Sequence, residues 1–120
     1  MKKHFLLALF TLFAISAFSQ SDTKNQIITT EFTVLGNCSM CKTRIEKAAK
    51  IKGVKSATWT VDNKTLKVEY SPSKTTPEAI HKNIAKAGHD TNKERASDKV
   101  YNKLHHCCKY SRSIHHKQSQ

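Results

Sequence analysis

Two of the four cysteines in this 120-residue chain are separated by two residues, in the segment Gly36-Asn37-Cys38-Ser39-Met40-Cys41. Two thiols at this spacing in a turn can face one ion. Cys41 also falls in the first turn of a predicted helix, where free backbone N–H groups and the helix dipole favour the thiolate over the thiol. The thiolate is the form that binds metal, and soft thiolates prefer Cu(I), Zn(II) and heavier thiophilic ions. Cys38 and Cys41 are therefore candidate metal ligands.

The C-terminal region carries a second group of candidate ligands, His105-His106-Cys107-Cys108, followed by His115 and His116. A run of imidazoles and thiols is typical of a metal-binding tract. The alternative is a disordered basic tail whose cysteines are incidental or form an intermolecular disulfide.

The tail cysteines are also within reach of the first pair. Residues 94–107 span about 20 Å even as a helix, so a composite site of Cys38, Cys41, Cys107 and Cys108 is geometrically permitted. In an oxidising compartment each pair can instead form a disulfide, which would remove both sites.

The segments between these groups predict a small α+β domain. Phe32 and Val34 alternate with polar residues, as in a strand with one buried face, and apolar residues then recur at helical spacing as far as Ala49. Thr76 and Pro77 are typical of the N-cap and first residue of a second helix. The predicted elements are a strand at 31–34, a helix at 41–50, strands at 57–61 and 66–70, a helix at 77–87 and a weak last strand at 89–93. This βαββαβ order is that of ferredoxin-like domains.

A Cys-x-x-Cys segment after the first strand of such a unit resembles the heavy-metal-associated domain family. That family comprises copper chaperones, metal-binding modules of P-type metal ATPases and the periplasmic mercuric-ion scavenger. The resemblance covers residues 30 to 91 and rests on the Cys-x-x-Cys segment together with 32–34, 42–50, 53–57, 66–70 and 84–88. It implies an open-faced sandwich of two helices on a four-stranded antiparallel sheet, with Cys38 and Cys41 as the metal ligands.

The chain departs from the family pattern in two places. The family usually has Gly-Met-x ahead of the first cysteine, whereas this chain has Leu35-Gly36-Asn37, so we expect Leu35 or Met40 to fill the space under the loop. His89 stands where the family usually has an aromatic residue or a lysine near the metal. An imidazole there is a candidate third ligand, which would favour Zn(II) or three-coordinate Cu(I). The alternative is a solvated histidine that merely replaces an aromatic ring.

The first residues have the pattern of a secretory signal peptide. A basic start is followed by about fourteen mostly apolar residues, with Ala17 and Ser19 at the −3 and −1 positions of a cleavage site. This stretch is shorter than the ~20 residues of a membrane-spanning helix. We therefore expect residues 1–19 to be removed, export to the periplasm, and no stable membrane insertion, with an uncleaved anchor as the alternative. The domain then occupies 27–92, and a basic tail occupies 93–120 with a short helix at 97–106 capped by Ser97.

The formal net charge of +12 does not indicate nucleic-acid binding. Positive residues are scattered, without an Arg-rich block or interleaved aromatic residues. An exported basic protein instead meets acidic partner surfaces and anionic membranes. Near the cysteine loop, Lys42 and Arg44 would offset the negative charge of a bis-thiolate site, and the alternative is a solvated helix face.

The expected function is capture of a thiophilic ion, Cu(I) before Zn(II) or Hg(II). The resemblance implies transfer to a metal-transporting P-type ATPase, a transporter or another metal-accepting protein by thiolate exchange. One alternative is a sequestering or sensing module that uses the tail. Another is a dithiol redox protein, which Pro72 and Pro77 disfavour because neither is placed to face the dithiol. We expect no enzyme, because the chain shows no carboxylate pair, Ser-His arrangement or Gly-rich phosphate loop.

Overall fold

The computed structural model describes residues 25–112. The predicted signal peptide at 1–19 and the candidate ligands His115 and His116 lie outside the described residues. Within residues 25–112, no helix is both long and apolar enough to cross a membrane.

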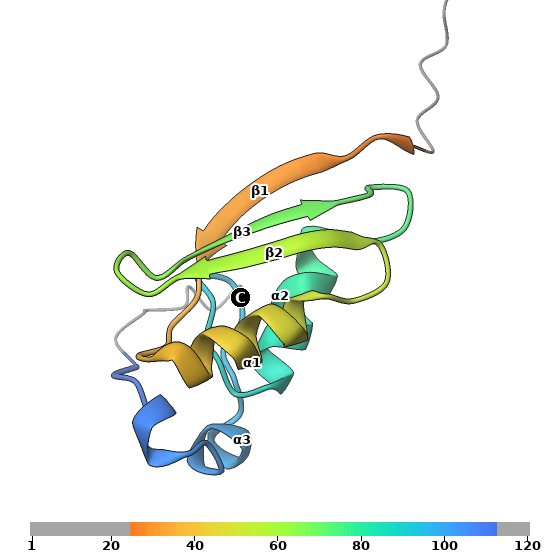
Figure 1. Cartoon of the computed structure of the whole chain (residues 1–120). Helices are drawn as coiled ribbons and strands as arrows, with labels where there is room; N and C mark the ends of the chain where they lie inside the picture. Colours follow the sequence, from red (N-terminus) through yellow and green to blue (C-terminus); the bar gives the residue numbers. More distant parts are fainter. Residues whose placement is uncertain (1–24, 113–120) are drawn as a thin grey trace, which may run out of the picture.

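The domain is a three-stranded antiparallel sheet with two helices on one face (Figure 1). Its elements are β1 (Ile28–Thr33), α1 (Ser39–Ala49), β2 (Val54–Thr60), β3 (Thr65–Tyr70) and α2 (Pro77–Lys86). β3 lies in the centre of the sheet, and Leu66 on β3 is paired with Phe32 on β1 and with Trp59 on β2. These elements confirm the predicted strand–helix–strand–strand–helix order.

The core lies between the sheet and the two helices. Alternating residues of the strands face the helices, and Trp59 is the largest of the fully buried side chains. The buried apolar residues contributed by the sheet and helices include Phe32, Cys41, Ile45, Trp59, Leu66, Val68, Ile80 and Ile84. The helix α1, which carries Cys41, thus packs on the sheet with the same apolar face that the sequence predicts.

The start of α2 follows the predicted capping pattern. The side chain of Thr76 accepts a hydrogen bond of 3.2 Å from the Ala79 N–H, and Pro77 is the first helical residue. Glu78 in the first turn complements the helix dipole.

The expected fourth strand at 89–93 is wrong for the described residues. Only one isolated antiparallel bridge, Val34 with Thr91, remains of it. The Thr91 hydroxyl oxygen accepts hydrogen bonds from the N–H groups of Lys93 and Glu94, at 3.1 and 2.9 Å. This side-chain bonding turns the chain away from β1 directly after the bridge, because it offers the backbone an alternative to a strand ladder.

The tail folds back against the domain. It contains α3 (Asp98–Asn102), which is shorter than the predicted helix at 97–106, and a 3₁₀ turn, η2 (His106–Cys108). Ser97 caps α3 as expected, by accepting a hydrogen bond from the Val100 N–H. The tail therefore adds a covering segment at the end of the domain where the β1–α1 loop lies (Figure 1).

Candidate metal centre

The loop between β1 and α1 is held by hydrogen bonds from three directions. The Leu35 N–H donates to the Asp90 carbonyl at 2.8 Å, and the Lys64 ammonium donates to the Gly36 carbonyl at 2.6 Å. The indole N–H of Trp59 donates to the Val34 carbonyl at 3.0 Å. The backbone that leads into the first cysteine is thereby fixed on the rigid sheet.

Gly36 lies in the tightest part of this loop. A Cβ atom at this position would lie 3.0 Å from the Cβ of Cys41 and 3.1 Å from both Ile45 and Trp59. The side chains of Cys41, Ile45 and Trp59 therefore fill the space under the loop at this position. Leu35 packs partly against the core, whereas Met40 is 45% exposed, so the expectation that Met40 fills this space is wrong.

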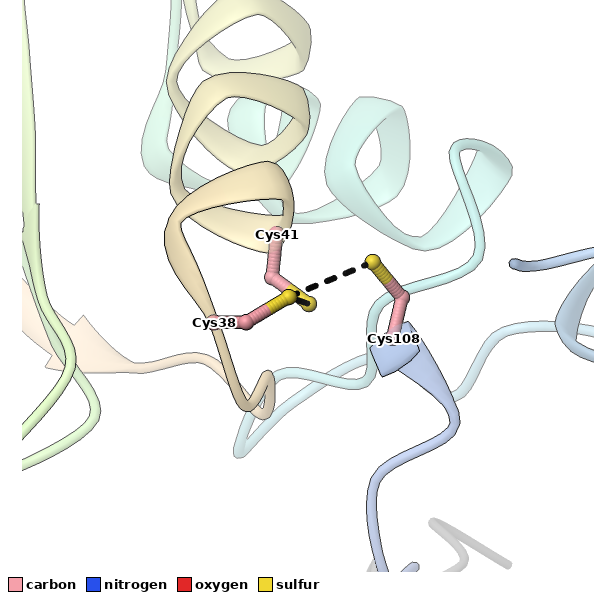
Figure 2. Close-up of side chains that lie close together, drawn as sticks. All are labelled: Cys38, Cys41 and Cys108. Atoms are coloured by element: carbon pink, nitrogen blue, oxygen red, sulfur yellow. Dashed lines mark hydrogen bonds between the residues drawn. The ribbon is translucent and has the colours of Figure 1, made fainter. Parts of the chain in front are cut away.

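Cys38 and Cys41 lie at the N-terminal end of α1 with their sulfurs 3.5 Å apart (Figure 2). Cys38 is the N-cap residue and is half-buried, whereas Cys41 is fully buried. The hydrogen bond that the Cys38 sulfur accepts from the Cys41 N–H lowers the pKa of Cys38 to about 7, although burial opposes this shift. A large share of Cys38 is therefore ionised near neutral pH and ready to bind a soft cation.

The tail brings Cys107 and Cys108 to the same place. The Cys38 sulfur lies 3.7 Å from that of Cys107 and 3.8 Å from that of Cys108. The sulfurs of Cys38, Cys41 and Cys108 all lie within 4.8 Å of one another, and Figure 2 shows Cys108 pointing from the tail toward the pair on α1. All four cysteines are free thiols.

The two tail thiols differ from Cys38 in their ionisation. Burial, followed by hydrogen bonding with the Cys41 thiol, raises the pKa of Cys108. The hydrogen bond with Cys38 and burial likewise raise the pKa of Cys107. In the metal-free chain the negative charge therefore resides on Cys38, and a bound cation would have to displace protons from the tail thiols.

His89 is placed beside the loop but not in the cysteine group. Its Nδ1–H donates to the Leu35 carbonyl at 2.8 Å, and its Nε2 has no hydrogen-bond partner within residues 25–112. The side chain is fully buried and stacks on the ring of Tyr110, so the alternative of a solvated imidazole is wrong. Burial lowers the pKa of His89, which keeps the ring neutral.

His105 and His106 lie at the edge of the cysteine cluster. Both are exposed, and their rings are in contact, with centroids 4.3 Å apart. The Nδ1 atom of His105 lies 3.3 Å from the Cys107 sulfur. The Met40 sulfur lies 3.9 Å from the same thiol. Cys107 thus lies next to both an imidazole nitrogen and a thioether sulfur.

The predicted charge-offsetting role of Lys42 is wrong, because its ammonium is occupied elsewhere. It donates to the Glu46 carboxylate at 3.0 Å and to the Trp59 carbonyl at 2.8 Å. Arg44 is exposed on α1. Within residues 25–112, the side-chain cation that hydrogen-bonds to the loop is Lys64. The sequence did not indicate this role, because Lys64 lies in the turn between β2 and β3, far from the loop along the chain.

The anchors of the tail were also missed from the sequence. The Tyr110 hydroxyl donates to the Gly88 carbonyl and accepts from the Asp90 N–H, each at 2.8 Å. The Arg112 guanidinium forms two hydrogen bonds of 2.8 Å with the Asp90 carboxylate. These contacts join residues about twenty positions apart, and no periodicity in the sequence indicates them.

Comparison with known proteins agrees with a metal-binding role for the cysteine loop. Residues 37–90 match the model of the heavy-metal-associated domain. No curated protein matches the chain.

Several solved structures are similar. "CopZ metallochaperone" shares 30% identity with a TM-score of 0.52, over 53% of this chain and 98% of that one. The N-terminal domain of a potential copper-translocating P-type ATPase from Bacillus subtilis, in the Cu(I)-loaded state, shares 31% identity with a TM-score of 0.52, over 55% and 85%. Oxidised MerP from Ralstonia metallidurans CH34 shares 28% identity with a TM-score of 0.52, over 55% and 94%.

Proposed function

Because the chain belongs to the heavy-metal-associated domain family, we propose that it captures a thiophilic metal ion through Cys38 and Cys41 and passes it to a partner by thiolate exchange. The observation that carries this proposal is the 3.5 Å separation of the two sulfurs at the N-terminal end of α1. Of the pair, Cys38 is the accessible thiol with the lowered pKa, and Cys41 is buried against the core.

Cu(I) is the proposed cargo, with Zn(II) and Hg(II) as alternatives. The similar proteins include a metallochaperone and a domain in its Cu(I)-loaded state, which supports copper. The family resemblance, which includes a mercuric-ion scavenger, keeps a heavier ion open. The donor set near the loop consists of thiols, a thioether and imidazoles, with no carboxylate in the group. Such soft donors favour Cu(I) over harder cations.

The transfer step follows from the unequal exposure of the two thiols. A thiolate of the partner approaches from the Cys38 side and forms a third sulfur–metal bond, after which the bond to Cys38 breaks. A second thiolate of the partner then binds the ion and the bond to Cys41 breaks. The two protons that the partner's thiols lose on binding go to the released thiolates of Cys38 and Cys41. Copper remains Cu(I) throughout, and it is never free in solution.

The proposed partner is a metal-transporting P-type ATPase, another transporter or a metal-accepting protein with an acidic face. One similar structure is a domain of a copper-translocating P-type ATPase. On this chain, a groove of about 570 Å³ next to the cysteine loop contains no acidic side chain and is lined by Ser39, Met40, Thr43, Arg44 and Lys47. A basic rim of this kind steers association with an acidic surface. The signal-peptide pattern at 1–19 supports the further proposal that the chain acts in the periplasm after cleavage.

An anaerobic titration of the reduced chain with Cu(I), against a chromophoric chelator, tests the binding. We expect one tightly held ion per chain, and loss of tight binding in Cys38→Ser. Ser39→Ala is the matched control, because Ser39 is exposed on the same turn and offers no sulfur. Unchanged affinity in Cys38→Ser would refute the proposed site, and absence of tight metal binding would favour a dithiol redox protein.

The transfer step is tested by the rate at which loaded protein gives Cu(I) to an added dithiol. Associative exchange predicts a rate that increases with the dithiol concentration. A rate independent of that concentration would mean that copper dissociates first, which contradicts direct transfer.

A further inference from the structure

We propose that the tail supplies a built-in third ligand, Cys108, which closes the site over the metal, and that Cys107 beside it is the thiol through which the ion leaves. This inference rests on the proposed metal capture by Cys38 and Cys41 and deepens it. The chain would then hold its cargo in three-sulfur coordination, and a partner would have to displace the tail.

The spacing of the sulfurs fits a shared ion. With metal–sulfur bonds of about 2.3 Å, ligands in a trigonal site lie about 4.0 Å apart, and the two ligands of a linear site about 4.6 Å apart. The sulfur of Cys38 lies 3.5 Å from that of Cys41 and 3.8 Å from that of Cys108. The third pair, Cys41 and Cys108, lies within 4.8 Å. Shifts of less than about 1 Å therefore bring all three sulfurs to trigonal spacing, whereas a linear site requires Cys38 and Cys41 to separate by about 1 Å and leaves Cys108 without a role.

The burial of the sulfurs divides their roles. Cys41 and Cys108 are both fully buried, so together they form the closed side of the group. Cys107 is half-buried, contacts Cys38 at 3.7 Å and Cys108 at 3.9 Å, and lies next to His105. Cys107 and the neighbouring Cys38 therefore form the open side of the group, and Cys107 is the tail thiol that both a bound ion and a partner can reach.

The position of Cys108 is set by anchors on both sides of it. Before it, Leu104 is buried against Gly88, where an added Cβ would lie 2.9 Å from the leucine Cδ2. After it, the Tyr110 hydroxyl is bonded to the backbone of Gly88 and Asp90. Both anchors attach to the loop that follows α2, and the same loop binds the cysteine loop through the Leu35 N–H.

An ion pair fastens the end of the described tail. Asp90 is 1% exposed and receives two hydrogen bonds of 2.8 Å from Arg112. Burial alone would raise the pKa of Asp90, but hydrogen bonds from Arg112 and the Ala96 N–H outweigh it and hold the pKa below its usual value. A segment attached this firmly presents its cysteines at one place.

The tail ligands are a feature of this chain beyond the matched domain. The family match ends at residue 90, ahead of both tail cysteines. The comparison with the CopZ metallochaperone uses nearly all of that chain but only 53% of this one. The two-cysteine site of the matched region is thus complemented here by a segment outside it.

The exchange step balances without a change of oxidation state. The Cys107 thiol first replaces Cys108: a Cu(I)–Cys107 bond forms, the Cu(I)–Cys108 bond breaks, and the proton of Cys107 passes to the Cys108 thiolate. The thiol of the incoming partner then replaces Cys107 in the same way: a sulfur–Cu(I) bond to the partner forms, the bond to Cys107 breaks, and the partner's proton passes to the Cys107 thiolate. The tethered Cys108 thiol acts at high effective concentration and competes with the partner, so it slows release of the ion.

The test measures the number of sulfur ligands by copper X-ray absorption and the rate of Cu(I) release to a chromophoric chelator, on the full chain with one Cu(I). We expect three sulfurs in the wild type, two in Cys108→Ser, and a release rate about tenfold or more higher in that variant. Cys107→Ser is the matched control: it should keep three sulfurs and release more slowly to an added dithiol.

A second variant avoids changing any ligand. Tyr110→Phe removes the hydroxyl that anchors the tail while all four thiols remain, and we expect its release rate to lie between those of the wild type and Cys108→Ser. Two sulfurs in the wild type, or equal release rates in the wild type, Cys108→Ser and Tyr110→Phe, would overturn the proposal. Such a result would leave the proposed function intact as long as Cys38→Ser abolishes binding, so the two failures are distinguishable.

Discussion

Replacement of Arg112 by methionine is expected to destabilise the fold far more than the same replacement of Arg95. Both arginines lie near the buried Asp90 carboxylate, but their contacts differ. Arg112 is 11% exposed and forms two hydrogen bonds of 2.8 Å to the carboxylate, whereas Arg95 is 47% exposed and approaches no closer than 3.8 Å. The pair of variants therefore separates a buried ion pair from a nearby exposed charge.

The magnitude follows from the cost of an unpaired buried charge. Removing one partner of a buried pair typically costs about 3–5 kcal/mol. The Ala96 N–H still donates to Asp90 in the variant, so we expect Arg112→Met to lower the free energy of unfolding by about 3 kcal/mol. Arg95→Met should cost less than about 1 kcal/mol, since its contact is long and exposed to solvent.

Denaturant unfolding of the reduced, metal-free chain measures this difference, with the fluorescence of the buried Trp59 as the probe. Hydrogen exchange of the Ala96 amide, which is bonded to Asp90, reports the local effect. If Arg112→Met and Arg95→Met lower the free energy of unfolding by the same amount within error, the ion pair of Arg112 with Asp90 does not hold the tail in place.

Three further predictions concern groups around the site. Burial lowers the pKa of His81 to about 4, from about 6.5 in an unfolded chain, so stability should be complete above pH 6.5 and decrease by about 3 kcal/mol as the pH falls to 4. Denaturant unfolding against pH tests this. The buried His89 adds a loss of the same sign, so His81→Gln should remove about 3 kcal/mol of the total loss rather than all of it, and an unchanged pH dependence in that variant would contradict the prediction. In the metal-free chain, alkylation of Cys38 by iodoacetamide, followed by mass spectrometry, should reach half its maximal rate near pH 7, whereas a midpoint near 9 would oppose the stated role of the Cys41 N–H. Gly36→Ala should cost about 1–3 kcal/mol in unfolding free energy because of its close contacts, with Ser39→Ala as an unaffected control.

The elements that carry the first cysteine pair were predictable because their signals are local. Alternation around Trp59 and Leu66, and helical spacing after Cys41, are set by burial on one face of each element. The N-cap at Thr76 is equally local, since its acceptor and donor lie three residues apart.

The remaining features depend on contacts that are distant in the sequence. The last strand was expected from a weak pattern, but the hydroxyl of Thr91 bonds the following backbone and ends the strand at one bridge. The sequence permitted a meeting of the two cysteine pairs but did not require it. The two pairs are brought together because Tyr110 and Arg112 form hydrogen bonds to the loop after α2. No local sequence pattern indicates these contacts.

His89 is a single residue whose surroundings also depend on a contact distant in the sequence. Its position after α2 indicated a place near the loop, and the structure puts it there. Its complete burial was not predictable, because the ring that covers it belongs to Tyr110, twenty-one positions further along the chain.

The most direct test of metal capture by Cys38 and Cys41 is anomalous diffraction at the copper edge, from crystals of the reduced chain loaded with one equivalent of Cu(I). We predict one strong peak within bonding distance of both sulfurs, at the N-terminal end of α1. A peak bound only by His105 or His106, or a Cys38–Cys41 disulfide with no peak beside it, would contradict the proposed function.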